Sequence, residues 1–481
     1  MSSKEWKQYT LSNEIIKAID LLGYKNPTKV QQQVIPAIIN KNDVIVKSQT
    51  GSGKTASFAI PICEQIIWEE NKPQAIIIEP TRELALQVKE DIFHIGRFKR
   101  IKPTAVYGRA PFINQVKELK QKTHVIVGTP GRIIDHLEKG TLDTSKIEYL
   151  VIDEADEMLR MGFIEQVAKI IESLPKKRVT LLLSATMPDN IESLCKQYMK
   201  EPLFITMEDQ NLTVDSIDQE AYIASEQEKF SLLKDIMILN NPDSCIIFCN
   251  TQKTVDEVAY KMMKNHLSCN QIHGGMEQRD RTNVMEQFRE GRFRYLIATD
   301  VAARGIDIDH ISLVINYELP KDKENYVHRI GRTGRVNREG KAISLVEDRD
   351  MRLLQSICEY IDKEIPVREA PLREKVLEYK EAFLLKNGDK PELKEKKGSS
   401  LNNNILKLHI NAGKKAKIRP VDIVGSICSI EGVTAEDIGI IQIVDISTFV
   451  EILNGKGKYV LKELLKKTIK GKVRKIRISN K

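Results

Sequence analysis

The amino-acid sequence predicts an α/β protein in which two open parallel-sheet domains stand in tandem, followed by a small α+β domain. Short β-branched runs alternate with helical stretches over the first 207 residues, and the same rhythm restarts near residue 218. Continuous apolar runs between helices are typical of buried parallel strands. Residues 402–481 instead follow the order strand, helix, strand, strand, helix, strand.

The first domain is expected at 1–207 and the second at 217–370. Strands of the first are predicted at DVIVKS, AIIIEP, HVIVGTP, YLVIDEAD and TLLLSAT, and strands of the second at CIIFCNT, CNQIHGG, YLIATD, SLVINYE and AISLVED. Polar or charged residues close many of these runs, at the strand ends where open α/β sheets place ligands. A linker is expected at 371–403, because its second half is charged, then rich in Gly, Ser and Asn, and lacks an apolar period.

The third domain is expected at 404–481, with strands at LKLHI, IGIIQIV, TFVEIL and VRKIRI and helices at RPVDIVGSICSI and YVLKELLKKTI. This split βαβ plan is the one that RNA-recognition modules use, so an RRM-like domain is predicted. From 402 to 481 there are 16 Lys and Arg against 7 Asp and Glu, a net of +9, whereas the whole chain carries +8. The asymmetry indicates a polyanion-binding end on a nearly neutral body. A merely solvated lysine-rich tail is the alternative, and it would lack the apolar pattern.

Several classes of protein are excluded by composition. No apolar run approaches the roughly 20 residues that span a bilayer, and the N-terminus lacks the apolar core of a signal peptide. Seven cysteines without a CxxC pair suggest neither a disulfide framework nor a zinc site. We therefore expect a cytoplasmic protein that does not bind membranes.

The stretch SQTGSGKT (48–55) lies between a predicted strand and a predicted helix. Small residues allow backbone N–H groups to surround phosphates, Lys54 can reach the β- and γ-phosphates, and Thr55 can ligate Mg²⁺. Ser48 takes the place of the first glycine of the usual phosphate-loop pattern. The predicted nucleotide-binding residues here are Ser48, Thr50, Gly51, Ser52, Gly53, Lys54 and Thr55.

Two further motifs carry charge that suits phosphoryl transfer. In VIDEAD (151–156), Asp153 can hold Mg²⁺ and Glu154 can orient or deprotonate the attacking water. An acidic helix N-terminus is the simpler interpretation of such a pair, but a phosphate loop one α/β unit upstream favours the catalytic one. In YVHRIGRTGR (326–335), Arg329, Arg332 and Arg335 indicate a loop that faces a phosphate across a cleft.

Together these stretches resemble the DEAD-box RNA helicases over about the first 370 residues. The ordered motifs are GYKNPTKVQ (23–31), SQTGSGKT (48–55), PTRELA (80–85), TPGR (129–132), DEAD (153–156), SAT (184–186), CIIFCNT (245–251), QRDR (278–281), ATDVAARGID (298–307) and HRIGRTGR (328–335). The resemblance implies two RecA-like domains that hydrolyse ATP with Mg²⁺ when RNA is bound.

The resemblance also implies roles for single residues. Gln31 would read the adenine edge, with Tyr24 and Trp6 packing at the base, although the family usually has phenylalanine where Trp6 stands. Asp307 would contact the ribose, Arg332 and Arg335 would act as arginine fingers, and His328 would link motifs across the cleft. Ser184 and Thr186 would couple the ATP site to strand separation.

RNA contacts would come from Thr81, Arg82, Gly108, Thr129, Arg132, Gln278, Arg281 and Thr299. Gly108-Arg109 replaces the usual glycine pair, so the added guanidinium of Arg109 could contact phosphate in place of a close backbone approach.

The C-terminal segment resembles that of the DbpA subgroup of bacterial DEAD-box proteins, whose RNA-recognition-like domain binds a hairpin of 23S ribosomal RNA. KLHINAGKKAKIRPVDIVGSI, DIGIIQI, FVEILNGKG and TIKGKVRKIRI carry the resemblance. Because only His409 and Phe449 offer rings on the predicted central strands, we expect RNA capture by basic loops, with candidates Lys414, Lys415, Lys417, Arg419, Lys456 and Lys458.

The implied activity is local unwinding of short duplexes in 23S rRNA during assembly of the large ribosomal subunit, by a monomer acting on pre-50S particles. A general helicase in mRNA turnover or cold adaptation, and an ATP-dependent RNA clamp with little unwinding, stay open as alternatives.

Overall fold

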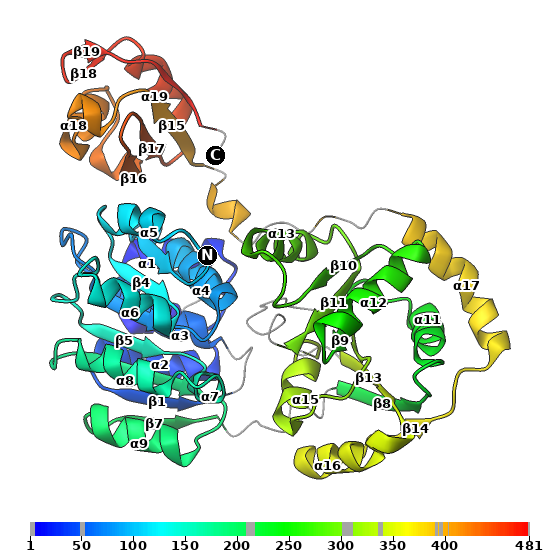
Figure 1. Ribbon diagram of the computed structural model, residues 1–481. Coiled ribbons are helices and arrows are strands. Elements are labelled where there is room, and N and C mark those ends of the chain that lie inside the picture. Colours follow the sequence, from blue (N-terminus) through cyan, green and yellow to red (C-terminus); the bar gives the residue numbers. More distant parts are fainter. Residues whose placement is uncertain are drawn as a thin grey trace.

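The computed structural model describes residues 5–48, 53–207, 217–300, 311–334, 340–389, 393, 398–402 and 404–479. Figure 1 shows three bodies in these residues: two open sheets flanked by helices, and a smaller domain at the C-terminus. Thr50, Gly51, Ser52, Asp307 and Arg335, five of the predicted site residues, lie outside the described residues.

The first sheet has seven parallel strands. From edge to edge they are β3 (Pro103–Val106), β4 (Val125–Gly128), β2 (Ala75–Ile78), β5 (Tyr149–Ile152), β6 (Val179–Ser184), β1 (Val44–Lys47) and β7 (Leu203–Thr206). Their alternate side chains enter two separate cores, so both faces must be covered. One face packs on α1 (Asn13–Leu21), α2 (Lys29–Ile39), α3 (Lys54–Gln65) and α4 (Arg82–Ile95); the other packs on α6 (Pro130–Glu138), α7 (Ala155–Arg160), α8 (Ile164–Glu172) and α9 (Asp189–Tyr198). Helix α5 (Phe112–Leu119) lies beside β3.

The second sheet repeats this plan with seven parallel strands. Their order is β10 (Cys269–Ile272), β11 (Tyr295–Thr299), β9 (Cys245–Cys249), β12 (Leu313–Asn316), β13 (Gly340–Val346), β8 (Ile217–Ile223) and β14 (Val367–Arg368). One face packs on α13 (Gln278–Arg289), α15 (Lys323–Ile330) and α16 (Met351–Ile361), and the other on α11 (Lys229–Asn240) and α12 (Gln252–Lys264). Cys245 and Cys249 are buried, as expected for the apolar run that contains them.

The C-terminal domain is a four-stranded antiparallel sheet covered on one face by two helices. The strand order is β16 (Ile438–Ile443), β17 (Thr448–Ile452), β15 (Leu406–Ile410) and β20 (Ile476–Ile478). Helices α18 (Pro420–Cys428) and α19 (Gly457–Leu464) bury its apolar side chains, and β18 (Thr468–Ile469) with β19 (Lys472–Val473) forms a short hairpin. The predicted βαββαβ order is therefore present, with an added hairpin before the last strand.

The predicted linker interval contains more structure than the sequence indicated. Helix α17 (Arg373–Gly388) packs on α11 and buries Phe383 in the core of the second domain. The composition that predicts a linker lies in the second half of the interval, whereas α17 occupies mainly the first half, where leucines stand on several sides of the helix. Within the described residues no helix is long and apolar enough to cross a membrane.

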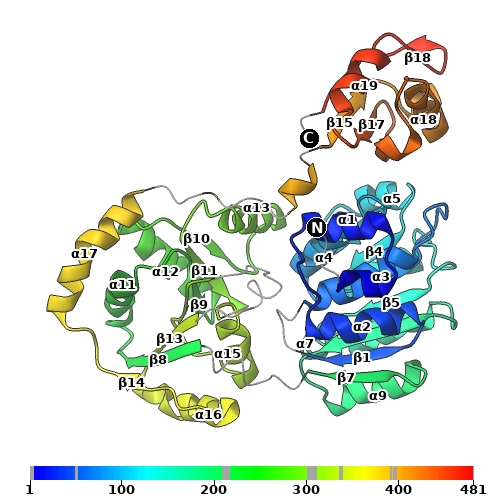
Figure 2. The same cartoon turned by 180° about the vertical axis from the view of Figure 1, so that it is seen from behind.

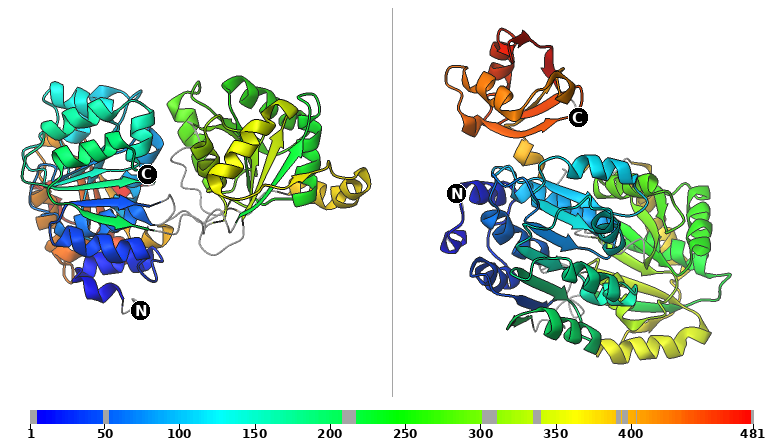
Figure 3. Two further views of the ribbon diagram at one scale, coloured as in Figure 1. Left: turned by 90° about the horizontal axis from the view of Figure 1, so that it is seen from below. Right: turned by 60° about the vertical axis from the view of Figure 1, so that its left-hand side comes forward.

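The C-terminal domain lies against the first domain, near α1 and α5, as the views from opposite sides in Figures 1 and 2 show. Arg97 and Glu451 form an ion pair of 3.4 Å across this contact, with side chains only 6% and 10% exposed. Lys17 Nζ donates to Asn454 Oδ1 at 3.2 Å, and the Arg100 guanidinium donates to the Ala435 carbonyl oxygen. The right-hand view in Figure 3 shows the domain on the same side of the molecule.

Candidate functional site

The phosphate loop ends where α3 begins, with Lys54 as the first helical residue. Gly53 precedes it with φ +86°, and a Cβ there would lie 2.6 Å from Gln31 Nε2, so this position requires glycine. Lys54 Nζ donates to the Ser48 carbonyl oxygen at 2.9 Å and is buried. Thr55 follows in the first helical turn. The Lys54 side chain is therefore folded back toward the end of β1.

Gln31 joins the loop to the start of α2. The Thr28 amide donates to Gln31 Oε1 at 2.9 Å, which completes a capping box, and Gln31 Nε2 donates to the Gly53 carbonyl oxygen at 3.2 Å. Trp6 is completely buried in the core and its indole N–H donates to the Tyr24 carbonyl oxygen at 2.9 Å. The Trp6 ring is thus enclosed by the protein, whereas Tyr24 is partly exposed, and their packing at the base stays a prediction.

Asp153 and Glu154 stand directly after β5, at the carboxyl edge of the first sheet. The Asp153 side chain is buried, and Glu154 is partly buried. Burial raises the pKa of Asp153, and burial together with the Asp153 carboxyl raises the pKa of Glu154 to about 7. Glu154 has φ +48°, and its amide donates to Asp153 Oδ1 at 2.9 Å. The backbone turn therefore sends two adjacent carboxyl groups to one place.

The SAT residues contact the last acid of the DEAD motif. Asp156 Oδ2 accepts from the Thr186 amide at 3.0 Å and from its hydroxyl at 3.2 Å. The Ser184 hydroxyl donates to the Thr186 carbonyl oxygen at 2.6 Å and accepts from the Asp156 amide at 3.2 Å. The segment after β6 is thereby joined rigidly to the segment after β5.

A small pocket at this edge is shared by the two sheet domains. Its lining residues are Lys54, Glu154, Asp156, Glu157, Ala185, His328 and Arg332. His328 lies in α15 and Arg332 follows it, and the Arg332 charge acts on the Glu154 carboxyl group. Arg160 reinforces the contact between the domains, since its guanidinium lies 3.1 Å from Glu324 and 3.3 Å from Asn325.

Arg329 is not part of this pocket, which corrects the expectation that it faces a phosphate. It is 1% exposed, and its guanidinium forms a two-pronged contact with Asp300, at 2.5 and 2.8 Å. It also donates to Asn250 Oδ1 and to the Glu318 carbonyl oxygen. Its part of the motif is helical, and the side chain ties strand ends of the second domain together.

A polar cluster joins three of the predicted RNA-contact residues across the two domains. Arg82 Nη1 donates to Gln278 Oε1 at 2.9 Å. Glu83 accepts from Gln278 Nε2 at 3.0 Å and pairs with Arg281 at 2.9 Å. Glu83 was not a candidate from the sequence. The only sequence signal was its position beside Arg82 in the first turn of α4, where acids are common anyway.

Arg132 is held in place by a buried network that the sequence did not reveal. Its guanidinium donates to Gln115 Oε1 at 2.8 Å and to the Ala110 carbonyl oxygen at 3.1 Å. His136 Nε2 lies 3.1 Å from the same Gln115 oxygen, and His136 Nδ1 lies 2.8 Å from Thr141 Oγ1. An amide oxygen only accepts, so His136 carries its proton on Nε2.

The remaining predicted RNA-contact residues have separate environments. Thr81 caps α4 by accepting from the Leu84 amide, Thr129 precedes α6, and Thr299 ends β11. Arg109 has φ +56°, and its guanidinium donates to the Gly274 carbonyl oxygen of the second domain at 3.3 Å. A Cβ on Gly108 would lie 3.8 Å from the Arg82 guanidinium, an ordinary distance.

The basic candidates of the C-terminal domain divide into two groups. Four lie on one exposed loop before α18, and Lys458 is exposed in α19; the four are Lys414, Lys415, Lys417 and Arg419. Lys456 is different, because its ammonium group donates to Asp437 and to the Gly432 carbonyl oxygen, both at 2.8 Å. Asp437 is buried, but its hydrogen bonds with Asn454 and Lys456 lower its pKa to about 2. The hydrogen bonds of the Lys456 ammonium group therefore stabilise the C-terminal domain itself.

The open face of the C-terminal sheet carries a cluster that the sequence reading underrated. His409 on β15 and Phe449 on β17 are paired in register and stack, with ring centroids 4.9 Å apart. Arg477 Nε donates to His409 Nδ1 at 3.0 Å, and Lys407 Nζ lies 5.5 Å from the Phe449 ring centroid. This is an aromatic platform edged by positive charge.

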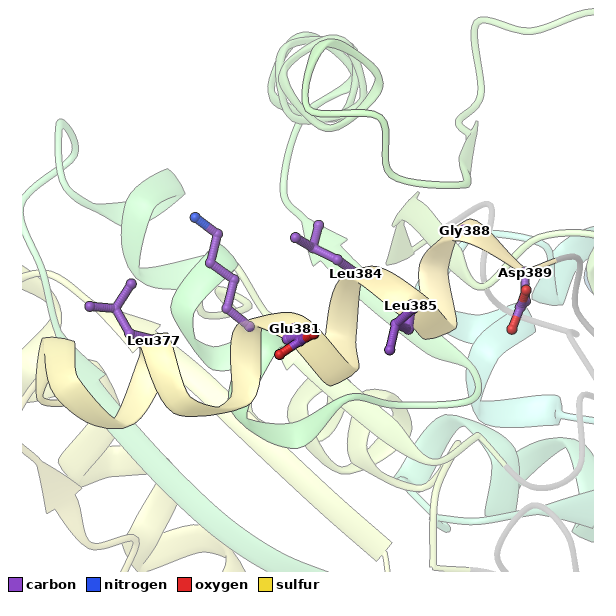
Figure 4. Close-up of a pocket in the computed structure, with 7 residues that line it drawn as sticks. Leu377, Glu381, Leu384, Leu385, Gly388 and Asp389 are labelled. Atoms are coloured by element: carbon purple, nitrogen blue, oxygen red, sulfur yellow. The ribbon is translucent and has the colours of Figure 1, made fainter.

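A shallow depression elsewhere lies along α17, lined by Leu377, Leu384 and Leu385 with Lys380, Glu381, Gly388 and Asp389. Figure 4 shows these residues along the helix, with Leu384 and Leu385 pointing in different directions. It lacks the convergent basic groups Lys54, His328 and Arg332 of the pocket between the domains, so it is not a candidate for phosphate recognition.

Two family models match the paired sheet domains: the DEAD/DEAH box helicase model over residues 28–194 and the helicase conserved C-terminal domain model over 228–337. They assign the two sheet domains to the DEAD-box helicases, whose two domains are RecA-like. The DbpA RNA binding domain model matches residues 407–478. The chain belongs to the DbpA family of DEAD-box ATP-dependent RNA helicases, so the predicted fold class and enzyme class are confirmed.

Similar proteins agree with this assignment. The ATP-dependent RNA helicase DbpA of Bacillus subtilis is 56% identical over 476 residues, covering 99% of each chain. The helicase CshA of Geobacillus kaustophilus is 40% identical over 373 residues, covering 78% of this chain and 80% of its own. Saccharomyces cerevisiae Dbp5 bound to RNA and ADP BeF3 matches with a TM-score of 0.71 and 32% identity, over 80% of this chain and 99% of that one. Mss116p bound to ssRNA and AMP-PNP matches with a TM-score of 0.69 and 28% identity, over 80% and 82%.

Proposed function

We propose that this helicase locally unwinds or remodels 23S rRNA on pre-50S particles during assembly of the large ribosomal subunit in the cytoplasm, acting as a monomer. The observation that carries the proposal is a basic C-terminal domain of the DbpA RNA-binding type, present next to a complete helicase core. The core offers groups that suit sugar and phosphate, which carry little sequence information. Choice of substrate therefore falls to the C-terminal domain, which would hold an rRNA hairpin.

For the nucleotide, the loop amides and Lys54 would bind the phosphates of ATP, and Gln31 would read the adenine edge. Thr55 and Asp153 present the hydroxyl and carboxylate oxygens that Mg²⁺ prefers, so the donor set fits this ion. When bound, Mg²⁺ would neutralise phosphate charge. Glu154 would take a proton from the attacking water, and Arg332 would stabilise charge on the transferred phosphoryl group. The proposed positions of Asp307 and Arg335 follow the family resemblance alone.

For RNA, the contacts between Glu83, Gln278 and Arg281 support a switch between two sets of partners. A backbone phosphate would compete with Glu83 for Arg281 and with Gln278 for Arg82. Thr81, Gly108, Thr129, Arg132 and Thr299 would complete the path along one strand. Binding of RNA across both domains favours the form in which Arg332 faces Glu154, and this links RNA binding to hydrolysis.

Coupling would pass through Ser184 and Thr186, because their hydrogen bonds end on Asp156, next to the catalytic acids. His328 contributes from the second domain to the same pocket. Loss of the γ-phosphate would therefore alter the hydrogen bonds at the strand ends that carry the interdomain contacts. Loss of phosphate would release these contacts and reopen the cleft.

In the C-terminal domain, the loop with Lys414, Lys415, Lys417 and Arg419 would contact phosphates, assisted by Lys458. The stacked His409 and Phe449 add a platform on which an unpaired base could stack. Lys456 would act indirectly, by keeping the β17–α19 turn in place through Asp437.

The deciding experiment compares the ATPase rate of the full-length protein with intact 23S rRNA and with an equal mass of unrelated RNA at the same salt concentration. Strong preferential stimulation by 23S rRNA is expected, and replacing Lys414, Lys415 and Lys417 by Gln should remove the preference. Equal stimulation by both RNAs would contradict the proposed substrate and favour a general helicase. Salt must be matched, because phosphate contacts make affinity strongly dependent on it.

A further inference from the structure

Glu79 is a buried carboxyl group that none of the proposed steps uses. It directly follows β2 and is 0% exposed. Neither of its carboxyl oxygens has a hydrogen-bond partner among the residues that the structure describes. A buried carboxyl group without partners costs free energy, and buried acids normally bind a cation or a hydrogen-bond donor. Its position therefore requires an explanation.

The sheet places Glu79 beside Asp153. Strands β2 and β5 are parallel neighbours in which Ile78 pairs with Ile152, so the next residues on the two strands stand side by side. The Asp153 amide donates to the Ile78 carbonyl oxygen at 3.1 Å, which continues the pairing past the end of β5. The two acids are thus adjacent at the carboxyl edge of the sheet.

Both acids also project from the same face. Ile77 and Val151, two positions earlier on each strand, lie in the core that packs on α3. Side chains two residues apart in a strand share a face, so Glu79 and Asp153 point to the side of α3, where Lys54 begins the helix. The charges of Asp153, Glu154 and Lys54 all act on the Glu79 carboxyl group.

We propose that Glu79 is a third carboxylate of the divalent-cation subsite, acting through a water molecule of the hydrated Mg²⁺ to set its affinity. This inference rests on the proposed function, in which Thr55 and Asp153 hold the ion. Mg²⁺ gives up its waters reluctantly, so protein carboxylates often bind it through its water shell. Such outer groups orient the direct ligands and tune the ion. The subsite holds three acids, whereas Lys54 already donates to Ser48, so a divalent cation would satisfy the unpartnered group.

The test measures nucleotide binding at equilibrium without RNA, so it does not depend on turnover. A fluorescent ADP analogue is bound to the full-length protein and MgCl₂ is titrated from zero. We expect E79Q to raise the half-saturating Mg²⁺ concentration about tenfold or more, as loss of an outer-shell partner typically does. Nucleotide binding in EDTA should be unchanged. E148Q is the matched control, because Glu148 is an exposed acid directly before β5, at the opposite end of the strand that Asp153 follows.

Two comparisons separate the possible failures. If D153N shifts the Mg²⁺ dependence and E79Q does not, Glu79 is only a buried neutral acid and the inference is overturned. If neither variant shifts it, the proposed cation site itself fails. Thermal unfolding without Mg²⁺ checks that E79Q folds. Should it not fold, E79D retains the charge on a shorter side chain, and a smaller shift in the same direction supports the inference, whereas no shift overturns it.

Discussion

Individual side chains in this helicase are positioned by hydrogen bonds that the motifs do not mention. Glu154 depends on a left-handed backbone turn after β5, and Arg132 depends on Gln115. In each case a motif residue is held by a neighbour that lies outside the motif or by an unusual backbone angle. The residues of a motif therefore indicate which reaction is possible, while these contacts determine where the reacting side chains lie.

Replacing Glu154 by Gln is expected to lower RNA-stimulated ATP turnover by at least about 100-fold, because general bases contribute roughly 10²–10⁴ to rate. Binding of ATP should persist, since Lys54 and the loop remain. Single-turnover hydrolysis and equilibrium nucleotide binding, measured on the same samples, separate the two effects. The exposed E148Q variant serves as control, and retained hydrolysis in E154Q would overturn the assigned role.

His136 offers a test of pH dependence. Burial, then the nearby Arg132 charge, lowers the pKa of His136 to about 4. Unfolded histidine titrates near 6.5, so the unfolded state binds the extra proton as pH falls below about 6.5. The stability that neutral His136 contributes is therefore fully present above about pH 6.5 and is lost as the pH falls toward 4.

NMR of the His136 ring should show the neutral form with the proton on Nε2 down to at least pH 5. The H136Q variant should remove part of the pH dependence of unfolding of the first domain. A ring that titrates near its ordinary pKa, or an unchanged slope of stability against pH in H136Q, would contradict this prediction.

At the scale of elements, helix α17 extends the second domain into the interval 371–403 that the sequence predicts to be a linker. It packs on α11 through Phe383, which is 4% exposed, yet Leu377, Leu384 and Leu385 face solvent. Adjacent positions 383 and 384 thus differ in burial although both are apolar. The helix forms because tertiary packing selects one of its several apolar sides.

Replacing Phe383 by Ala is expected to destabilise the second domain by about 3–5 kcal/mol, the usual cost of removing a buried ring. L384A on the same helix is the matched control and should change stability by less than about 0.5 kcal/mol. Urea unfolding combined with hydrogen exchange at α11 and α17 measures both. Equal effects of the two substitutions would show that α17 does not pack in this way.

At the scale of the whole molecule, side-chain contacts between the domains join the candidate ATP site, the candidate RNA-binding residues and the C-terminal domain. Arg160, Glu83 and Arg109 connect the two RecA-like domains, and Arg97 connects the first of them to the C-terminal domain. Removing one partner of a buried ion pair leaves an uncompensated charge, so the Arg97–Glu451 contact should control the docking of the C-terminal domain.

The charge reversal E451K should weaken this docking by about 3–5 kcal/mol, since two positive groups would then be buried together. Energy transfer between dyes on the first and C-terminal domains should fall. The double exchange of R97E with E451K restores opposite charges and should recover much of the transfer. No change in E451K, or no recovery in the double variant, would contradict a docking role for this pair.

The sequence by itself determined the class of this protein. Ordered motifs, apolar strand runs and a basic βαββαβ tail depend on local residue order, and the predicted fold class is confirmed, although parts of several motifs lie outside the described residues. Candidate phosphate-binding residues such as Lys54 could be named because a loop between a strand and a helix is a local structure. The roles of the catalytic and RNA-binding residues stay predictions until the experiments above are done.

Only the tertiary structure decided which side chains meet. Glu83 with Arg281, Gln115 with Arg132, and Glu451 with Arg97 are separated by tens to hundreds of residues, and no local period links them. The burial of Trp6 and Arg329 could likewise not be predicted, nor could the hydrogen bonds of Lys456, because both depend on what packs from elsewhere in the chain. Glu79 is the clearest case: an ordinary acid in the sequence becomes an unpartnered carboxyl group beside Asp153 because two strands distant in sequence are neighbours in one parallel sheet.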